Sequence, residues 1–350
     1  MIESWRLPGT LLPDGHATQL WIAEGRLTNT PIADAEPLPG RFALPGLVDA
    51  HCHLALGRGF RGLGVAGVVG ALREARDRGV LLIRDVGAPG SITLDVAPDP
   101  TLPELHAAGR WFAPEDRFFA ALHDPVSADE LVAAAMAELA HGARWIKIIA
   151  DWAEGEGEAR KVVPSYDVET LRLLVDAVHA AGARVATHTQ SPFAKDLVAI
   201  GVDSIEHGTW LDESTLREMA GRGTAWTPTL TAIASPMPED APKARRRAWL
   251  DALDNVREMV PLGARLGVTI LAGTDASGTV AEEVAHLREF GLEPAAALRA
   301  ATTAARTFLG APAMTVGAPA DVVTYDADPR EHPEVLDRPA AVVLRGQRIS

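Results

Sequence analysis

Two histidines separated by one residue, His51 and His53, follow directly on the apolar stretch Leu44–Ala50. Alternate residues of a β-strand point to the same face, so both imidazoles can reach one ion while Cys52 faces the opposite side. Two imidazoles on one face are typical of a metal site, but a His-x-His pair alone is weak evidence for one. Other ligand-type residues are needed at the same place.

Three further residues of metal-binding type end short apolar runs elsewhere in the chain. His188 ends Arg-Val-Ala-Thr-His, His207 ends Ser-Ile-Glu-His, and Asp275 ends Leu-Ala-Gly-Thr-Asp. The carboxyl ends of the strands of a parallel barrel meet at one mouth, so we expect these side chains to lie beside His51 and His53. Imidazole and carboxylate ligands together favour Zn²⁺, with Mn²⁺, Fe²⁺ or Co²⁺ as alternatives.

Lys147 is an unusual charged residue because it lies inside the apolar run Trp145–Ala150. A buried ammonium group costs free energy unless it is compensated, and a position beside metal ions favours the neutral amine. A neutral amine can add carbon dioxide to become a carbamate, whose two oxygens can bind one ion each. Lys147 therefore predicts a bridging ligand between two ions, and pairing with Asp151 or another carboxylate is the alternative.

The other candidate ligands also have ordinary structural explanations. A strand histidine can be a hydrogen-bonded core residue, and Asp275, which precedes Ala-Ser-Gly, can cap the following helix. Several such residues at the same end of different strands favour a shared metal centre over separate structural roles.

The elements that must position these residues follow from short apolar runs that alternate with longer amphipathic stretches from about residue 45 to residue 310. The expected strands are Gly46–Asp49, Val80–Ile83, Phe118–Leu122, Trp145–Ala150, Arg184–Ala186, Ser204–Glu206, Thr224–Thr227 and Val268–Ala272. The expected helices are Val65–Arg78, Ala128–Ala140, Val168–Ala181, Ala194–Ile200, Glu213–Gly221, Lys243–Leu266, Val280–Phe290 and Pro294–Leu309. This order predicts an α/β fold, a TIM-like (β/α)8 barrel over residues 45–316, with an open doubly wound sheet as the alternative.

Both ends of the chain contain short apolar pieces between Pro, Gly and Asp turns, which predicts antiparallel strands. Examples are Leu20–Ala23, Ala320–Tyr325 and Ala341–Leu344. We expect residues 1–44 and 317–350 to form together one small β-sandwich subdomain.

Composition limits the function further. The 350 residues include 33 basic and 47 acidic ones, a net charge of −14, which gives no electrostatic basis for binding nucleic acid or an anionic membrane. Cys52 is the only cysteine, residues 1–25 lack the pattern of a secretory signal, and the apolar runs are too short to span a bilayer. We expect a cytoplasmic protein that acts on a small-molecule substrate, and a homo-oligomer is compatible with the sequence.

These motifs resemble the amidohydrolase superfamily, whose pattern is His-x-His after strand one, Lys after strand four, His after strands five and six, and Asp after strand eight. The matching segments, which cover most of the chain, are Asp49-Ala-His-Cys-His, Ile83-Arg-Asp-Val-Gly, Trp145-Ile-Lys, Thr187-His, Ser204-Ile-Glu-His-Gly and Ala272-Gly-Thr-Asp. Arg-Asp-Val-Gly and Ile-Glu-His-Gly are similar to the branch that contains imidazolonepropionase-like enzymes, Xaa-Pro dipeptidases and ochratoxin-type amidases.

The resemblance implies a role for each ligand. His51, His53 and Asp275 would bind the more buried ion, and the carbamate of Lys147 would bridge it to a more exposed ion. His188 and His207 would bind that second ion. A hydroxide shared by both ions would attack the substrate carbonyl, and Asp275 would pass its proton to the leaving amine.

The expected activity is metal-dependent hydrolysis of a C–N bond in an amide, dipeptide, cyclic amide or carbamate. An ester or lactone is an alternative target of the same dinuclear centre. A mononuclear deaminase of this superfamily would lack Lys147 and carry Glu where this chain has Ser191, so both residues disfavour that alternative. A barrel that binds a ligand without turnover is the alternative from another class.

Candidate substrate contacts are His123 after the expected third strand and Tyr166 after the fourth, although a loop role is the alternative for both. The guanidinium groups of Arg58 and Arg61 could pair with a substrate carboxylate, or be solvated loop charges. Three tryptophans near strand ends could form an apolar pocket wall: Trp152, Trp210 and Trp226. The basic run 245–247 is most simply a solvated helix face.

Overall fold

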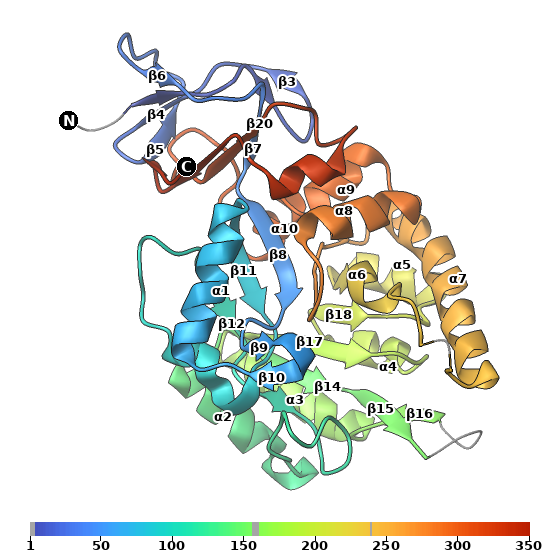
Figure 1. The fold of residues 1–350 in the computed structure, drawn as a ribbon. Coiled ribbons are helices and arrows are strands. Elements are labelled where there is room, and N and C mark those ends of the chain that lie inside the picture. Colours follow the sequence, from blue (N-terminus) through green and yellow to red (C-terminus); the bar gives the residue numbers. More distant parts are fainter. Residues whose placement is uncertain (1–3, 156–160, 239) are drawn as a thin grey trace.

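Parallel strands form the centre of the protein and helices cover them (Figure 1). The computed structural model describes residues 4–155, 161–238 and 240–350. The central strands are β8 (Leu47–Cys52), β11 (Val80–Asp85), β12 (Glu104–Ala107), β13 (Trp111–Phe112), β14 (Trp145–Ile149), β17 (Arg184–Thr189), β18 (Ser204–His207) and β19 (Ala225–Thr227). They form two sheets, in the orders β12-β11-β8 and β13-β14-β17-β18-β19, with parallel pairing throughout.

Two chain segments connect these sheets. Strands β12 and β13 are separated by only three residues, and each belongs to a different sheet. At the other side, Leu271 N donates to Trp226 O (2.8 Å) and Ala50 N donates to Ala272 O (2.9 Å). The segment around residues 269–275 therefore lies between β19 and β8.

The helices surround these strands and follow the predicted ranges closely. They are α1 (Val65–Asp77), α2 (Leu131–His141), α3 (Val168–Ala180), α4 (Ala194–Ala199), α5 (Glu213–Arg222), α6 (Leu230–Ile233), α7 (Lys243–Leu266), α8 (Val280–Glu289), α9 (Pro294–Ala300) and α10 (Thr303–Phe308). Side-chain caps define several starts: Asp167 accepts from Thr170 N, Asp212 accepts from Thr215 N, and Thr279 caps α8. The predicted helix 294–309 is two helices, because the backbone leaves the helical region at Thr302.

The predicted third strand, Phe118–Leu122, is wrong. Strands β12 and β13 occupy that place, interrupted by Gly109 at φ 75°, so no continuous apolar run marks them. The aromatic run 118–122 instead packs ring against ring beyond the strand ends, with Phe118 5.4 Å from Trp111 between centroids. The predicted eighth strand is also irregular, because its ladder is reduced to isolated bridges at Ile270 and Asp275.

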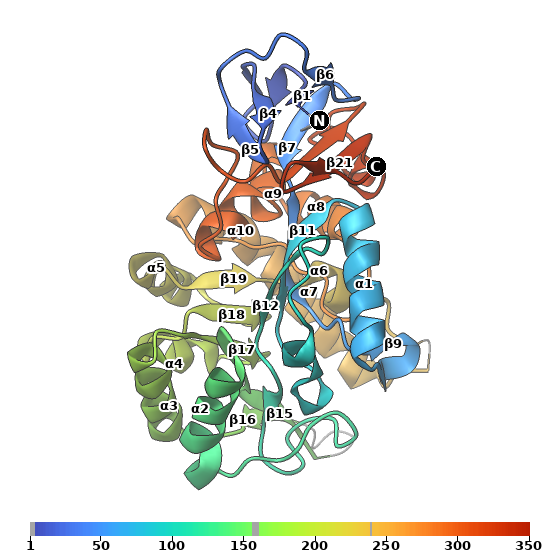
Figure 2. The same cartoon turned by 90° about the vertical axis from the view of Figure 1, so that its left-hand side faces the viewer.

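Short strands from both termini form two further sheets, with orders β5-β4-β1-β6 and β22-β21-β20-β7-β2-β3 (Figure 2). Their bounds are β1 (Trp5–Arg6), β2 (Thr10–Leu11), β3 (His16–Ala17), β4 (Trp21–Ala23), β5 (Arg26–Thr28), β6 (Glu36–Pro37), β7 (Phe42–Pro45), β20 (Val322–Tyr325), β21 (Ala341–Leu344) and β22 (Gln347–Arg348). One apolar cluster joins both sheets, with Trp5 and Ile22 from one and Val322 and Val343 from the other. The two termini therefore meet, as predicted, while the boundaries 1–44, 45–316 and 317–350 stay a prediction.

Smaller elements lie beyond the strand ends: β9 (Leu56–Gly57) with β10 (Arg61–Gly62), and β15 (Asp151–Glu154) with β16 (Lys161–Pro164). Within the described part of the chain, we find no helix with the length and apolar character needed to cross a lipid bilayer.

Candidate metal centre

The predicted metal ligands lie together at the carboxyl ends of the central strands. The ring centroids of His188 and His207 are 4.6 Å apart, and those of His51 and His207 are 5.2 Å apart. His53 lies 5.3 Å from His51 in the same measure. Residues far apart in the sequence are thus brought to one place by four different strands or strand ends.

His51, His53 and Asp275 have the spacing of ligands to a single ion. Asp275 Oδ1 lies 3.1 Å from His53 Nε2 and 3.6 Å from His51 Nε2. Ligand atoms around one tetrahedral zinc ion are separated by roughly 3.3 Å, given bonds of about 2.0–2.2 Å. The positions of the three side chains therefore fit a shared ion.

Hydrogen bonds orient both of these histidines with one nitrogen toward Asp275. His53 Nδ1 donates to Gly87 O (2.9 Å), and His51 Nδ1 lies 2.6 Å from Glu206 Oε2. His51 Nε2 is buried and has no hydrogen-bond partner in the described structure. A histidine fixed by a carboxylate or carbonyl on one nitrogen, with the other left as a lone pair, is the usual arrangement of a metal ligand.

Burial keeps these imidazoles neutral. It lowers the pKa of His51 to about 3, with the charge of Lys147 as the next cause, and it lowers the pKa of His207 to about 3. The pKa of His188 is also well below its usual value, because of burial and the nearby His207. Neutral imidazoles provide the lone pairs that bind metal ions.

Lys147 lines the same cavity as these ligands. Its side chain is buried, and Nζ makes no hydrogen bond within the described residues. Burial lowers the pKa of Lys147 to about 8, although Glu206 and Asp275 oppose the shift. The alternative pairing with Asp151 is wrong, because that carboxylate accepts from Thr189 Oγ1 (2.5 Å), Gln190 N (2.9 Å) and Ser191 Oγ (2.6 Å).

Sequence reasoning did not identify Glu206 and Arg84 as part of the centre. Arg84 Nη2 donates to Glu206 Oε1 (2.9 Å), both side chains are completely buried, and Ser204 Oγ donates to the same carboxylate oxygen (2.5 Å). Glu206 therefore lies between Arg84 and His51 and contacts both side chains. The signal was a charged residue inside each of two buried strands, at Arg84 in β11 and Glu206 in β18.

A second carboxylate, Asp49, joins β8 to the segment that carries Asp275. It accepts from Thr274 Oγ1 (2.7 Å) and Thr274 N (3.2 Å). Gly273 permits this close approach, since a Cβ there would lie 2.6 Å from His51 Cβ. Asp275 itself adopts φ 58°, a region that non-glycine residues rarely occupy and that is often found at functional sites.

We predict that Glu206→Gln will weaken metal binding about 10- to 100-fold, because His51 loses the carboxylate that orients it. The change also leaves Arg84 without its buried counter-charge, which should destabilise the metal-free protein by about 3–5 kcal/mol. Metal titration and urea unfolding measure these two effects separately. Glu213→Gln, at an exposed position on α5, is the control, and unchanged metal affinity in Glu206→Gln would contradict the orienting role.

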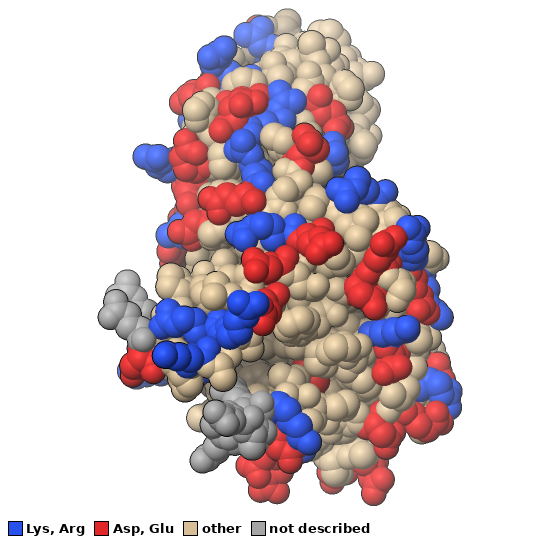
Figure 3. Space-filling view, turned by 90° about the vertical axis from the view of Figure 1, so that its right-hand side faces the viewer, with Lys and Arg blue, Asp and Glu red and all other residues tan. Residues whose placement is uncertain are grey.

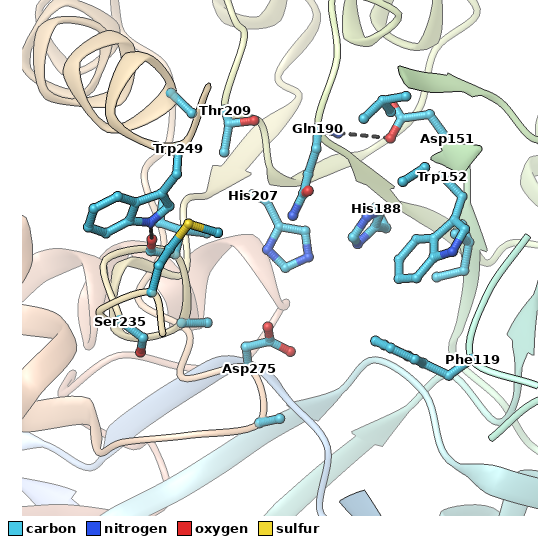
Figure 4. Close-up of a pocket in the computed structure, with 18 of the residues that line it drawn as sticks. Phe119, Asp151, Trp152, His188, Gln190, His207, Thr209, Ser235, Trp249 and Asp275 are labelled. Carbon is cyan, nitrogen blue, oxygen red and sulfur yellow. Dashed lines mark hydrogen bonds between the residues drawn. The ribbon is translucent and has the colours of Figure 1, made fainter. Parts of the chain in front are cut away.

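A cavity of about 1150 Å³ opens above the ligands and includes His51, His53, Lys147, His188, His207 and Asp275 in its lining (Figure 4). Trp152 and Trp210 line it as predicted, and Arg245 lies at its exposed rim. Trp226 is instead buried in the core, where its Nε1 donates to His207 O (2.8 Å).

The two predicted substrate contacts, His123 and Tyr166, are not among the described residues that line the cavity. The His123 ring nitrogens face Phe119 O (3.1 Å) and Pro114 O (3.3 Å), and the Tyr166 hydroxyl donates to Val126 O (2.8 Å). The misplaced third strand explains the error for His123. Arg61 is exposed and is not one of the described lining residues, and the side chain of Arg58 lies outside the described structure.

Comparison with known proteins agrees with this geometry. A model of the amidohydrolase family matches residues 42–349. An uncharacterized protein of Mycobacterium tuberculosis is 36% identical over 354 residues, covering 97% of this chain and 94% of that protein.

Solved structures show the same fold. A putative prolidase from Bifidobacterium longum is similar with a TM-score of 0.83 at 24% identity, over 100% of this chain and 95% of that one. The A. niger ochratoxinase is similar with a TM-score of 0.84 at 20% identity, over 99% and 96% of the two chains. The family match over most of the sequence and the identity to the mycobacterial protein show that this chain belongs to the amidohydrolase family.

Proposed function

We propose that this protein is a metal-dependent hydrolase that cleaves a C–N bond next to a carbonyl group, in an amide, dipeptide, cyclic amide or carbamate. One observation carries the proposal: a buried lysine, whose Nζ has no hydrogen-bond partner among the described residues, lies with four histidines and an aspartate in the lining of a large cavity. The similarity to a prolidase and an ochratoxinase supports the same class of reaction.

The donor set fits two divalent ions, with Zn²⁺ the first choice. His51, His53 and Asp275 would hold one ion, His188 and His207 the other, and Lys147, as a carbamate, would contribute one oxygen to each. When bound, the ions would lower the pKa of a shared water and so supply a nucleophile at neutral pH. We also propose that the two central sheets form a (β/α)8 barrel, which the hydrogen bonds of residues 269–275 to both sheets support. We propose further that the terminal sheets form a β-sandwich, which their shared apolar cluster supports.

Asp275 is the residue best placed to move a proton. Its side chain lies in the cavity lining, is 23% exposed and contacts both His51 and His53. A carboxylate at this position can accept a proton from the attacking water and deliver it to the leaving nitrogen, whose departure as a neutral amine requires that proton.

An ester or lactone is a second target for the same centre. Deamination is disfavoured by the resemblance, since this chain has Ser191 where the deaminases of the superfamily carry glutamate, and the Ser191 hydroxyl donates to Asp151. The single cysteine, Cys52, is buried and free, and we propose a cytoplasmic location on that basis.

Metal content and turnover test the proposal together. We expect about two ions per chain in protein loaded with Zn²⁺, with loss of amide hydrolysis on chelation and recovery when the ion is restored. The substrates are N-acyl amino acids, dipeptides, lactams, carbamates and lactones, and the products are assayed as free amine, ammonia or acid. Fewer than about one ion per chain, or hydrolysis that survives complete metal removal, would overturn the proposal.

A further inference from the structure

Two apolar walls face each other across the metal centre. The first, which we call the aromatic wall, consists of Phe60, Phe118, Phe119 and Trp152. The second, the α6–α7 wall, consists of Ile233, Met237, Trp249 and Leu253. Figure 4 shows His188, His207 and Asp275 between Trp152 and Phe119 on one side and Trp249 on the other.

The aromatic wall is a continuous surface that reaches the ligands. The centroid of Phe119 lies 5.1 Å from those of Phe118 and Trp152, and Trp152 lies 5.5 Å from His188. Phe119 is 50% exposed and Phe60 is 55% exposed, although both are large apolar side chains. Covering such rings with an apolar group is favourable in proportion to the area removed from water.

The α6–α7 wall is held in position by its own contacts. Trp249 Nε1 donates to Ile233 O (2.8 Å), which fixes the indole relative to the turn after β19. An indole whose only hydrogen-bond donor is already satisfied offers an apolar face to a ligand. A substrate whose scissile bond lies at the metal centre would therefore extend an apolar group toward each wall.

Few of the described side chains that line the cavity could pair with a substrate carboxylate. The cations of the described lining are Lys147, among the metal ligands, and three exposed residues at the rim: Lys161, Lys243 and Arg245. Figure 3 shows basic side chains on the outer surface beside a hollow.

The tyrosines do not provide an anion contact either. The chain has two, and their hydroxyls are already used: Tyr166 donates to Val126 O and Tyr325 to Leu336 O. Two arginines near Phe118 in sequence, Arg110 and Arg117, pair with Glu138 and Glu154, and Arg61, next to Phe60, is exposed and is not one of the described lining residues.

We propose that the substrate is an uncharged amide or carbamate that carries a bulky apolar group on both sides of the scissile bond, rather than a free dipeptide or an N-acyl amino acid. This inference rests on the proposed C–N hydrolase function. The two apolar walls indicate the bulky apolar groups of the substrate. The lack of a described cationic side chain beside the metal ligands, apart from Lys147, indicates that the substrate is uncharged.

A matched pair of substrates tests the inference on the metal-loaded protein. N-benzoyl-2-phenylethylamine and N-benzoylphenylalanine have the same skeleton and differ by one carboxylate. We expect kcat/KM to be at least about tenfold higher for the neutral amide, which corresponds to about 1.4 kcal/mol. Equal values, or a preference for the acid, would overturn the inference while leaving the hydrolase proposal intact.

Binding of non-cleavable analogues keeps the test independent of turnover. Ketones in which CH₂ replaces the amide nitrogen of each compound are titrated into the metal-loaded protein by calorimetry. We expect the neutral ketone to bind at least about tenfold more tightly than its carboxylate counterpart. If the neutral ketone binds more tightly but no amide or carbamate is hydrolysed, the result would contradict the proposed function and support the inferred type of ligand. Tighter binding of the carboxylate ketone would overturn the inference.

A wall variant supplies the matched control. Phe119→Ala should raise KM for N-benzoyl-2-phenylethylamine about tenfold, because its bulky group reaches the aromatic wall. The same variant should leave KM for amides as small as N-methylacetamide unchanged. Leu173→Ala, which removes an equally exposed apolar side chain from α3 outside the cavity, should change neither value. An equal effect of Phe119→Ala on large and small amides would contradict the assignment of the wall.

Discussion

Asp275→Asn is expected to lower kcat for amide hydrolysis by about 10²–10⁴-fold, because asparagine keeps the shape of the side chain but cannot accept and return a proton. In the wild type, the carboxylate lies 3.1 Å from His53 Nε2 and 3.6 Å from His51 Nε2. The same substitution removes a negative ligand from the His51–His53 pair, so the ion held there should be lost more readily. Steady-state kinetics and metal content of the same preparation measure both effects.

Asp254→Asn, at an exposed position on α7, is the control for this substitution and should leave activity and metal content unchanged. The dependence on pH separates the two roles of Asp275. If Asp275 carries the proton, its loss should remove the decline of kcat at low pH. If the substitution only weakens metal binding, the pH profile of kcat should keep its shape in the fraction of protein that remains loaded with metal. Activity within a few-fold of wild type would contradict both roles.

The strands that carry the ligands could be predicted because they are buried on both faces. Such strands are mostly apolar, and in β14 a single polar side chain, that of Lys147, interrupts the apolar run, while in β17 His188 follows the short run Val185–Ala186. His188 and Lys147 were therefore visible as exceptions in an apolar context. The helices were visible for a related reason, since α3 buries Leu171, Leu174, Val175 and Val178 at helical spacing.

The third strand could not be predicted in this way. Strand β12 includes Glu104 and His106, and Gly109 interrupts it before β13, so its apolar signal is weaker than that of the neighbouring run 118–122. Sequence periodicity does not distinguish an apolar run that forms a ladder from one that packs ring against ring. The incorrect placement of His123 at a strand end followed from this one error.

The partners of the ligands and the cavity walls depend on tertiary contacts. A buried charge such as Arg84 is equally compatible with a ligand, a partner or a core ion pair until Glu206 is known to lie 2.9 Å away. Similarly, Phe119 and Trp249 are 130 positions apart in the sequence. Only the fold brings their walls to opposite sides of one metal centre.

Lys147→Ala is expected to lower kcat by at least about a hundredfold and to reduce the number of bound ions, because the proposed carbamate would be the one ligand shared by both sites. The wild-type lysine is suited to carbamate formation: Nζ is buried and has no hydrogen-bond partner in the described part of the chain, and burial lowers its pKa to about 8. In the proposed reaction the ammonium group first loses one proton, the neutral amine attacks carbon dioxide to form an N–C bond, and a second proton leaves, which would convert a buried cation into an anion between the two sites.

Rescue distinguishes a lost bridging ligand from damage to the core. The cavity left by the lysine side chain can admit acetate or propionate, whose carboxylate offers the same two oxygens as the carbamate. Activity and metal content of Lys147→Ala should therefore rise together with the concentration of either acid, while chloride at the same ionic strength has no effect. Lys195→Ala, at an exposed position on α4, should match the wild type without added acid. Full activity of untreated Lys147→Ala would refute the bridging role, because alanine offers no ligand atom to either ion.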